Sequence, residues 1–159
     1  MTFDFSEFKN KKIIVTGSST GIGFETGIEF LNLGSNVIFH GNQSINDLEA
    51  RVKTKSQSQN FKIFKSDFTE LSQVDDFMNN AINYLDGLDI LINNAGTMVG
   101  RYQLDTISEK DFLKIFDLNA KSAYFATKSA CTIFKKQNYG NIINVSTISA
   151  RTGGSAGSS

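Results

Sequence analysis

Residues 16–23 read Thr16-Gly17-Ser18-Ser19-Thr20-Gly21-Ile22-Gly23 and join two segments of different periodicity. The segment before them, Lys12–Thr16, is mostly β-branched and predicts a strand. After them, Phe24, Ile28 and Leu31 follow one another at i, i+4 and i+7, which is the spacing of an amphipathic helix. The stretch therefore predicts a strand, a glycine turn and a helix that begins at Gly21 or Ile22.

The glycine turn is suited to binding a phosphate group. Glycine lets the backbone approach a ligand closely, and the N-terminus of a helix presents unpaired N–H groups and a positive dipole end. We therefore interpret the turn as a dinucleotide phosphate loop, whose cofactor-binding residues are Gly17, Ser18, Ser19, Thr20, Gly21, Ile22 and Gly23.

The spacing of these glycines leaves an alternative open. The order G-x-x-x-G-x-G departs from the G-x-G-x-x-G fingerprint of many dinucleotide-binding turns. It also lacks the Gly-Lys-Ser/Thr ending of a nucleoside-triphosphate loop. An ordinary tight connection between a strand and a helix, which requires small residues, would look similar, so the rest of the chain has to decide.

Strand and helix segments alternate along the rest of the chain, which favours βαβ units and a parallel sheet. Further strands are predicted at residues 36–40, 61–65, 89–93 and 141–145, and helices at 44–55, 74–85 and 108–136, the last broken near 117–119. The expected fold is α/β, a doubly wound parallel sheet of Rossmann-like type with helices on both faces. The first, fourth and fifth strands are nearly continuous apolar runs, so we expect helices to cover both of their faces.

Length and composition indicate one ordinary globular domain, residues 1–159, with hydrophobic and charged contents of 40% and 20%. Sixteen basic residues balance sixteen acidic ones, so neither nucleic acid nor a membrane surface is an expected partner. No apolar run reaches membrane-spanning length, and residues 1–11 lack a secretory signal. Because Cys131 is the one cysteine, no internal disulfide can form, and together these features favour a cytoplasmic protein. Residues 153–159 are rich in Gly and Ser and are predicted to form a flexible loop.

Five short motifs follow one another in a characteristic order. They are the glycine turn, Asp67 after the third strand, Asn93-Asn94-Ala95-Gly96 after the fourth, Asn119 within Asp117-Leu118-Asn119-Ala120, and Gly140–Thr147 around the fifth strand. In this order the chain resembles the short-chain dehydrogenase/reductase family from Lys11 to its last residue. The resemblance implies an NAD(P)(H)-dependent oxidoreductase that transfers a hydride between nicotinamide and a carbonyl or alcohol substrate, and no metal is implied.

The motifs suggest roles for individual residues beyond the glycine turn. Asp67 is positioned to accept a hydrogen bond from the adenine amino group with Phe68 against the ring edge, the alternative being a simple capping Asp before Thr69. Asn94, Ala95 and Gly96 combine an amide with small residues where the backbone must pass close to the cofactor. In the family, the residue matching Asn119 holds a water on the proton-relay path.

Three hydroxyls are candidates for the residue that polarises the substrate carbonyl. The family places a catalytic Ser after the fifth strand, usually as the second member of a Ser-Ser pair. Here the pair is Ser146-Thr147. We therefore predict Thr147 as the catalytic hydroxyl, with Ser146 and Ser149 as alternatives. The two hydroxyls that are not catalytic would only form hydrogen bonds with backbone groups of the loop.

The choice of cofactor depends on the end of the second strand. A carboxylate there would bind the ribose 2′-hydroxyl of NAD, but the sequence reads His40-Gly41-Asn42-Gln43. NADP is therefore predicted, without excluding NAD, and Ser18, Ser19 and Asn42 are candidate donors to the 2′-phosphate. No Arg or Lys stands at the usual positions, and His40 is interpreted as a strand-end side chain rather than a catalytic base.

In the family, a Tyr-x-x-x-Lys motif after the fifth strand supplies the general acid, and no such motif follows residue 145 in residues 1–159. Counted from Thr147, it is expected one or two residues beyond Ser159, so we expect an incomplete domain that ends after the fifth strand. Two functions stay open: the amino-terminal part of a reductase, or a non-catalytic nucleotide-binding or assembly module. A 3-oxoacyl-thioester or a sugar or polyol is the expected substrate class, and a homo-oligomer is the expected assembly.

Overall fold

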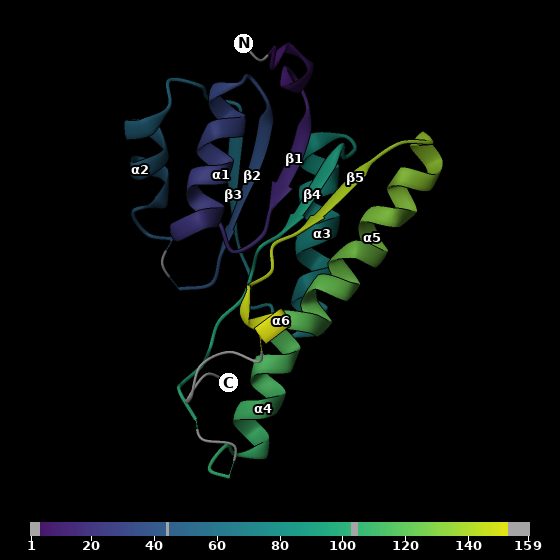
Figure 1. Ribbon diagram of the computed structural model, residues 1–159. Helices are drawn as coiled ribbons and strands as arrows, with labels where there is room; N and C mark the ends of the chain where they lie inside the picture. The colour runs from purple at the N-terminus through teal and green to yellow at the C-terminus, as the bar shows by residue number, and fades with distance from the viewer. Residues whose placement is uncertain (1–3, 44, 103–104, 153–159) are drawn as a thin grey trace.

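The computed structural model describes residues 4–43, 45–102 and 105–152. Its centre is a five-stranded parallel sheet in the order β3-β2-β1-β4-β5. The strands are β1 Lys12–Val15, β2 Asn36–Gly41, β3 Phe61–Lys65, β4 Ile90–Asn93 and β5 Asn141–Asn144 (Figure 1). The helices are α1 Gly21–Asn32, α2 Leu48–Lys55, α3 Leu71–Leu85, α4 Glu109–Phe116, α5 Ser122–Gln137 and α6 Ser149–Thr152.

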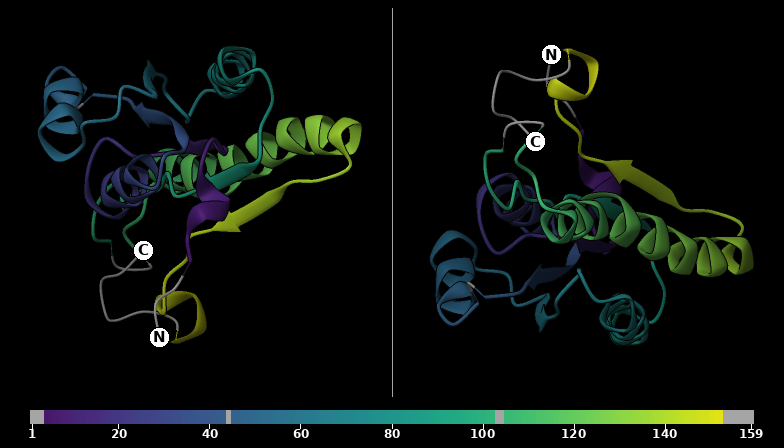
Figure 2. Two further views of the ribbon diagram at one scale, coloured as in Figure 1. Left: turned by 90° about the horizontal axis from the view of Figure 1, so that it is seen from above. Right: turned by 90° about the horizontal axis from the view of Figure 1, so that it is seen from below.

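The strand order confirms the predicted doubly wound sheet. From β1 the chain proceeds outward to β2 and β3, and then crosses back to β4 on the other side of β1. Seen end-on, α1 and α2 lie on one side of the sheet and α3 and α5 on the other (Figure 2, left). The order of strands reverses between β1 and β4, and in such sheets a ligand crevice forms at the carboxyl ends of those two strands.

The core consists of two apolar clusters, one on each face of the sheet. Alternate residues of a strand point to opposite faces, so Ile14 belongs to the cluster with α3 and α5, whereas Ile13 and Val15 belong to the cluster with α1 and α2. Helices therefore cover β1 on both faces, and the same holds for β4, which is buried at every position.

The prediction that helices cover both faces of the fifth strand is wrong. Ile142 packs against the cluster of α3 and α5, but Ile143, which points the other way, is 45% exposed. Within the part of the chain that the structure describes, β5 has a single strand neighbour, β4, and no helix covers its second face. Its apolar residues resemble those of a covered strand, and the sequence of β5 cannot reveal what lies opposite it.

The long helical region is interrupted where the sequence predicts a break. The hydroxyl of Ser108 accepts a hydrogen bond from the Asp111 N–H at 3.1 Å and caps α4, as predicted. Between α4 and α5, Asp117–Lys121 adopt a π-helical turn, a feature frequent at functional sites. No helix among the described residues is long and apolar enough to cross a membrane.

Two further predictions concern residues 44–47 and residues 153–159. The helix predicted at 44–55 begins only at Leu48, because residues 45–47 form a turn, and residue 44 lies outside the described residues. The loop predicted at residues 153–159 lies outside them as well. Cys131 carries a free thiol on α5 and is half-buried.

Candidate functional site

The loops that follow four parallel strands meet at the carboxyl edge of the sheet and enclose a cavity of about 270 Å³. Most of the residues proposed for cofactor binding line this cavity. The described residues around it are Gly17, Ser19, Thr20, His40, Gly41, Asn42, Gln43, Ser66, Asp67, Phe68, Thr69, Ala95, Gly96, Lys114 and Leu118. The fold therefore gathers segments up to about 100 residues apart in one place.

The glycine turn is packed tightly against the loop after β4. Gly17 has φ +60°, and a Cβ atom there would lie 2.6 Å from the Ala95 Cα. A side chain at Gly23 would collide with the Asn94 amide and would lie 2.7 Å from the Gly17 carbonyl oxygen. Both positions therefore require glycine, because the turn lies in close contact with the next loop.

The N-terminus of α1 opens toward the cavity without a side-chain cap. Thr20 precedes the helix, but its hydroxyl makes no capping hydrogen bond, and the first helical bond runs from the Phe24 N–H to the Thr20 carbonyl. A Cβ atom built on Gly21 would meet nothing within 4 Å. Helix N–H groups without a cap, at an open position, fit a phosphate group of a dinucleotide.

Thr16 connects the glycine turn to the loop after β4, a role that sequence reasoning missed. Its buried hydroxyl donates to the Ile92 carbonyl at 3.3 Å and accepts from the N–H groups of Asn94 at 3.0 Å and Ala95 at 2.9 Å. The Asn94 amide in turn donates to the carbonyls of Thr16 and Gly17, both at 3.0 Å. These bonds fix the two loops against each other.

His40 is a second residue whose role the sequence did not reveal. The ring lies at the end of β2, only 3% exposed, where its Nδ1 accepts a hydrogen bond from the Gly17 N–H at 2.9 Å. Its Nε2 lies 3.1 Å from the Ser66 carbonyl oxygen, and Phe68 stacks on the ring at 3.9 Å. Burial lowers the pKa of His40 to about 4, so the imidazole is neutral near pH 7.

Asp67 and Phe68 follow β3 at the wall of the cavity. Asp67 Oδ1 accepts hydrogen bonds from the Thr69 N–H at 3.0 Å and from its hydroxyl at 2.8 Å, which is a local turn and not a cap of α3, because that helix begins at Leu71 after Glu70. Burial raises the pKa of Asp67, but hydrogen bonds from Thr69 and Asn42 outweigh that effect and keep the pKa below its usual value. Contact of Asp67 or Phe68 with adenine stays a prediction.

Asn119 lies on the π-helical turn and holds the loop after β4. Its amide donates to the carbonyls of Thr97 at 2.7 Å and Ile115 at 3.0 Å, and its Oδ1 accepts from the Thr97 N–H at 2.8 Å. A Cβ atom on Gly96 would lie 2.6 Å from that same oxygen. The role of Asn119 in holding a water stays a prediction.

The three candidate hydroxyls lie after β5 rather than in the cavity. Ser146 and Thr147 are exposed, and Thr147 Oγ1 accepts a hydrogen bond from the Ser149 N–H at 3.2 Å. The end of β5 is joined to β4, because the Asn93 amide donates to Asn144 Oδ1 at 2.9 Å. The structure therefore places these hydroxyls at the same edge of the sheet as the cavity.

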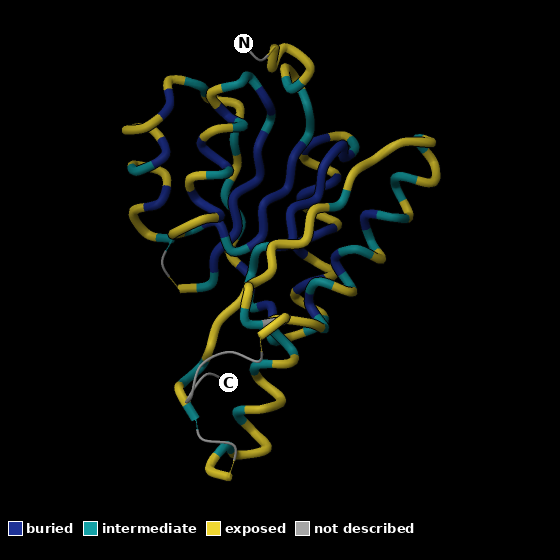
Figure 3. Tube along the Cα trace, in the orientation of Figure 1, coloured by how far each residue is buried: buried dark blue, intermediate teal, exposed yellow. Residues whose placement is uncertain are grey.

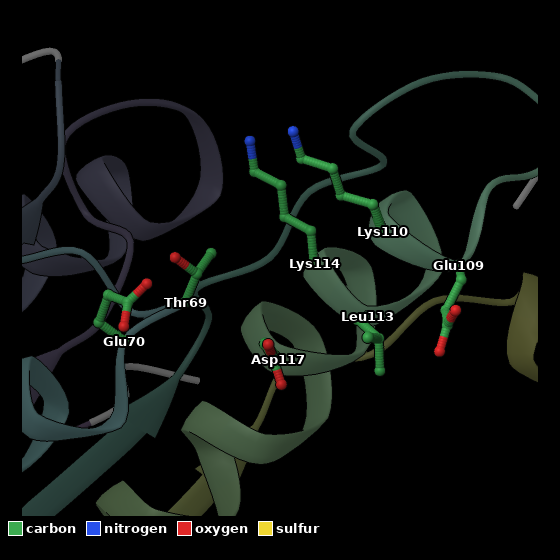
Figure 4. Close-up of a pocket in the computed structure, with 7 residues that line it drawn as sticks. All are labelled: Thr69, Glu70, Glu109, Lys110, Leu113, Lys114 and Asp117. Carbon is green, nitrogen blue, oxygen red and sulfur yellow. The ribbon is translucent and has the colours of Figure 1, made fainter.

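Two positive groups near the cavity come from helices that the motifs did not indicate. Lys114 of α4 lines the cavity, and Arg51 of α2 donates to the Ser19 carbonyl in the glycine turn. A neighbouring cavity of about 460 Å³ shares Lys114 and Thr69 with the first one. Figure 4 shows Lys110 and Lys114 extending side by side from α4 at its rim.

The crevice, the glycine turn and the uncapped helix are together typical of a dinucleotide-binding α/β domain. The chain belongs to the short-chain dehydrogenase family, whose family model matches residues 11–159. The family resemblance deduced from the five motifs is thereby confirmed. No group of three or more His, Cys, Asp or Glu side chains able to hold a metal occurs among residues 4–43, 45–102 and 105–152.

Similar proteins that are named for an activity include two from yeasts. The chain is 32% identical over 142 residues to a probable NADP-dependent mannitol dehydrogenase of Yarrowia lipolytica, covering 89% of this chain and 51% of that protein. It is 32% identical over 152 residues to a sorbose reductase of Schizosaccharomyces pombe, covering 94% of this chain and 59% of that protein. The chain therefore spans about half the length of these relatives.

Solved structures show the same arrangement of elements. The NADH-dependent reductase A1-R′ in complex with NAD superposes with a TM-score of 0.87 at 30% sequence identity, covering 98% of this chain and 67% of that one. The same reductase, described as responsible for alginate metabolism, superposes with a TM-score of 0.86 in a further structure. The proteins similar to this chain thus include one named for NADP and one solved with NAD.

Proposed function

We propose that the protein is an NAD(P)(H)-dependent oxidoreductase that interconverts a carbonyl compound and an alcohol, with a sugar or polyol as substrate. The observation that carries the proposal is the glycine turn in the crevice between β1 and β4, where the uncapped N-terminus of α1 faces an open cavity. The names of the two yeast relatives support a ketose or polyol over a 3-oxoacyl thioester. The cytoplasm is the proposed location.

The proposed division of labour follows the positions of the residues. Residues 17–23 bind the pyrophosphate through backbone N–H groups, and residues 94–96 let the dinucleotide lie against the end of β4. When bound, the nicotinamide ring supplies or accepts the hydride. Thr147, with Ser146 as the alternative, donates a hydrogen bond to the substrate oxygen as negative charge develops on it, and Asn119 positions the loop beside it.

NADP(H) is the proposed cofactor because of what surrounds the end of β2. Residues 40–43 offer no carboxylate to a ribose 2′-hydroxyl. The Arg51 guanidinium donates to the Ser19 carbonyl and so brings a positive charge to the glycine turn. The same guanidinium lies 3.8 Å from the Asp47 carboxylate. Its Nε is a buried donor without a partner among the described residues. An arginine near a phosphate is a favourable pairing.

Nucleotide titration tests the proposal and the cofactor choice together. Quenching or enhancement of nicotinamide fluorescence should show saturable binding of NADPH, and weaker binding of NADH. Arg51→Gln should weaken NADPH by about 10-fold and leave NADH nearly unchanged, because a hydrogen bond to a charged group contributes about 1.5–3 kcal/mol. Lys53→Gln is the matched control, since Lys53 lies on the same helix and pairs with Glu49.

Turnover separates the reductase from a non-catalytic nucleotide-binding module. No Tyr-x-x-x-Lys motif follows β5 in residues 1–159, and Tyr124 and Lys128, which have that spacing, lie before β5 on α5. This chain alone should therefore bind NADPH without reducing fructose or sorbose. A chain extended to include that motif should reduce them, and Thr147→Val should reduce kcat strongly without weakening NADPH. A larger loss with Ser146→Ala or Ser149→Ala would reassign the catalytic hydroxyl, and an inactive extended chain that still binds NADPH would favour the binding module.

A homo-oligomer is proposed from the outer surface of α4 and α5. Phe112 and Phe116 of α4 stack with ring centroids 6.3 Å apart, and both are exposed, as is Tyr124 on α5. None of the residues of α4 is buried (Figure 3). Large exposed aromatic side chains of this kind are typical of surfaces that make protein–protein contacts. Light scattering should show an assembly that Phe116→Glu dissociates.

A further inference from the structure

His40 joins three segments of the cavity wall. Its ring accepts from the Gly17 N–H at 2.9 Å and lies 3.1 Å from the Ser66 carbonyl oxygen. Its backbone N–H donates to Ser18 Oγ at 2.8 Å, and its carbonyl accepts from the Ser18 N–H at 2.8 Å. The end of β2 is therefore bonded to the glycine turn after β1 and, through the ring, to the segment after β3.

The two ring nitrogens have fixed and different roles. The Gly17 N–H can only donate, so Nδ1 must carry a lone pair, and the Ser66 carbonyl can only accept, so Nε2 must carry the proton. The neutral imidazole with its proton on Nε2 satisfies both neighbours. A second proton, on Nδ1, would place two N–H groups 2.9 Å apart and break the bond to Gly17.

The packing around the ring favours this neutral form. Phe68 stacks on the imidazole at 3.9 Å with an interplanar angle of 27°, and Phe77 of α3 contacts it edge-on at 4.8 Å. Asp67 is the charged group that acts on the ring, and its attraction for an imidazolium is outweighed by burial. The ring should consequently stay neutral from pH 8 down to about pH 5.

We propose that His40 is a positioning residue for nucleotide binding, whose neutral Nε2-protonated ring holds the Gly17 N–H and the glycine turn in the conformation that receives the pyrophosphate. This role rests on the proposed nucleotide-binding function. His40 does not take a proton from the substrate; it acts through Gly17, the residue at the base of the turn.

The first test reads the proton position directly. His40 is the single histidine of the sequence, so its ring nitrogens can be assigned without ambiguity by ¹⁵N NMR of residues 1–159. Nδ1 should give the shift of an unprotonated nitrogen and Nε2 that of a protonated one, unchanged between pH 8 and pH 5.5. A proton on Nδ1, or titration near pH 6.5, would overturn the proposal, whatever the chain binds.

The second test separates positioning from general stability. His40→Asn places Oδ1 where Nδ1 was and retains an acceptor for Gly17, whereas His40→Leu fills the space without one. We expect NADP⁺ to bind at least about 10-fold more weakly to His40→Leu, and within about 3-fold of the original affinity to His40→Asn, because only the former leaves the Gly17 donor unpaired. Circular dichroism at the titration temperature confirms that each variant is folded.

A matched control comes from another buried polar residue, at the opposite end of β2. Ser35 is fully buried directly before β2 and donates to the Phe8 carbonyl at 2.7 Å, whereas the glycine turn contacts His40 at the other end of that strand. Ser35→Ala should lower the melting temperature without weakening NADP⁺. Equal losses of affinity in His40→Leu and His40→Asn would refute the positioning role. If the unchanged chain does not bind NADP⁺ while the NMR result holds, the proposed function fails and the role in binding fails with it.

Discussion

Replacing Thr16 by Val tests the main connection between the glycine turn and the loop after β4. The two side chains have nearly the same shape, and Thr16 is only 2% exposed, so the change removes a hydroxyl and little else. The lost bonds are those from the N–H groups of Asn94 and Ala95, at 3.0 and 2.9 Å, and the longer one to the Ile92 carbonyl. Two backbone donors are then left without a partner.

The expected loss of stability follows from those two donors. An unpaired buried donor costs about 1–3 kcal/mol, and here both N–H groups belong to partly buried residues, which places each near the lower end. We expect the free energy of unfolding to fall by about 2 kcal/mol. In a chain of this size 1 kcal/mol corresponds to roughly 2–4 °C, so the melting temperature should fall by about 4–8 °C.

Thermal and urea denaturation followed by circular dichroism measure this loss. Thr16→Ser is the control, because it retains Oγ and loses only a buried methyl group. Both variants should be less stable than the original, but NADP⁺ affinity should fall only for Thr16→Val, which also frees the Asn94 loop. A Thr16→Val chain with unchanged melting temperature and affinity would refute the reasoning.

Three further outcomes follow from other contacts. Gly23→Ala should abolish NADPH binding in a fluorescence titration, because its methyl group would displace the Asn94 amide from the glycine turn. Ser108→Ala should cost about 1 kcal/mol in urea denaturation by removing the cap that accepts from Asp111, with no change in nucleotide affinity. Acid should destabilise the fold: the pKa of His40 is about 4 when folded against 6.5 when exposed, so the unfolded chain takes up the proton first. Stability should therefore decline from pH 6.5 toward pH 4 by about 3 kcal/mol, and His40→Asn should remove most of that slope.

The helices and strands could be predicted because the spacing of apolar residues along the chain follows the face of each element that is buried. The stripe from Val74 to Leu85 is buried in the structure as predicted, and β3 has the predicted bounds. The helix predicted from residue 44 begins only at Leu48, because residues 45–47 form a turn and carry no periodic pattern. The exposure of Ile143 could not be predicted, because it depends on what covers the far face of β5.

Many of the residues that line the cavity could be predicted from the sequence, but the side chains that hold them in place could not. The motif residues carry local signals, such as closely spaced glycines or a polar residue after an apolar strand. Thr16 contacts a residue 78 positions away, Arg51 one that is 32 away, and His40 one that is 23 away. Such contacts depend on the register of β1 with β2 and β4, so no local pattern in the sequence can reveal them.

Gly17 shows why these distant contacts matter for binding. Its N–H is held by His40, its carbonyl by Asn94, and its Cα side lies against Ala95, so two separate segments, the ends of β2 and β4, fix one residue with φ +60°. A glycine-rich turn would otherwise lose much conformational freedom when a ligand orders it. Here folding has already removed that freedom, and a dinucleotide would meet a turn that needs little further ordering. The affinity of the glycine turn should consequently depend on the ends of β2 and β4 as much as on the turn's own glycines.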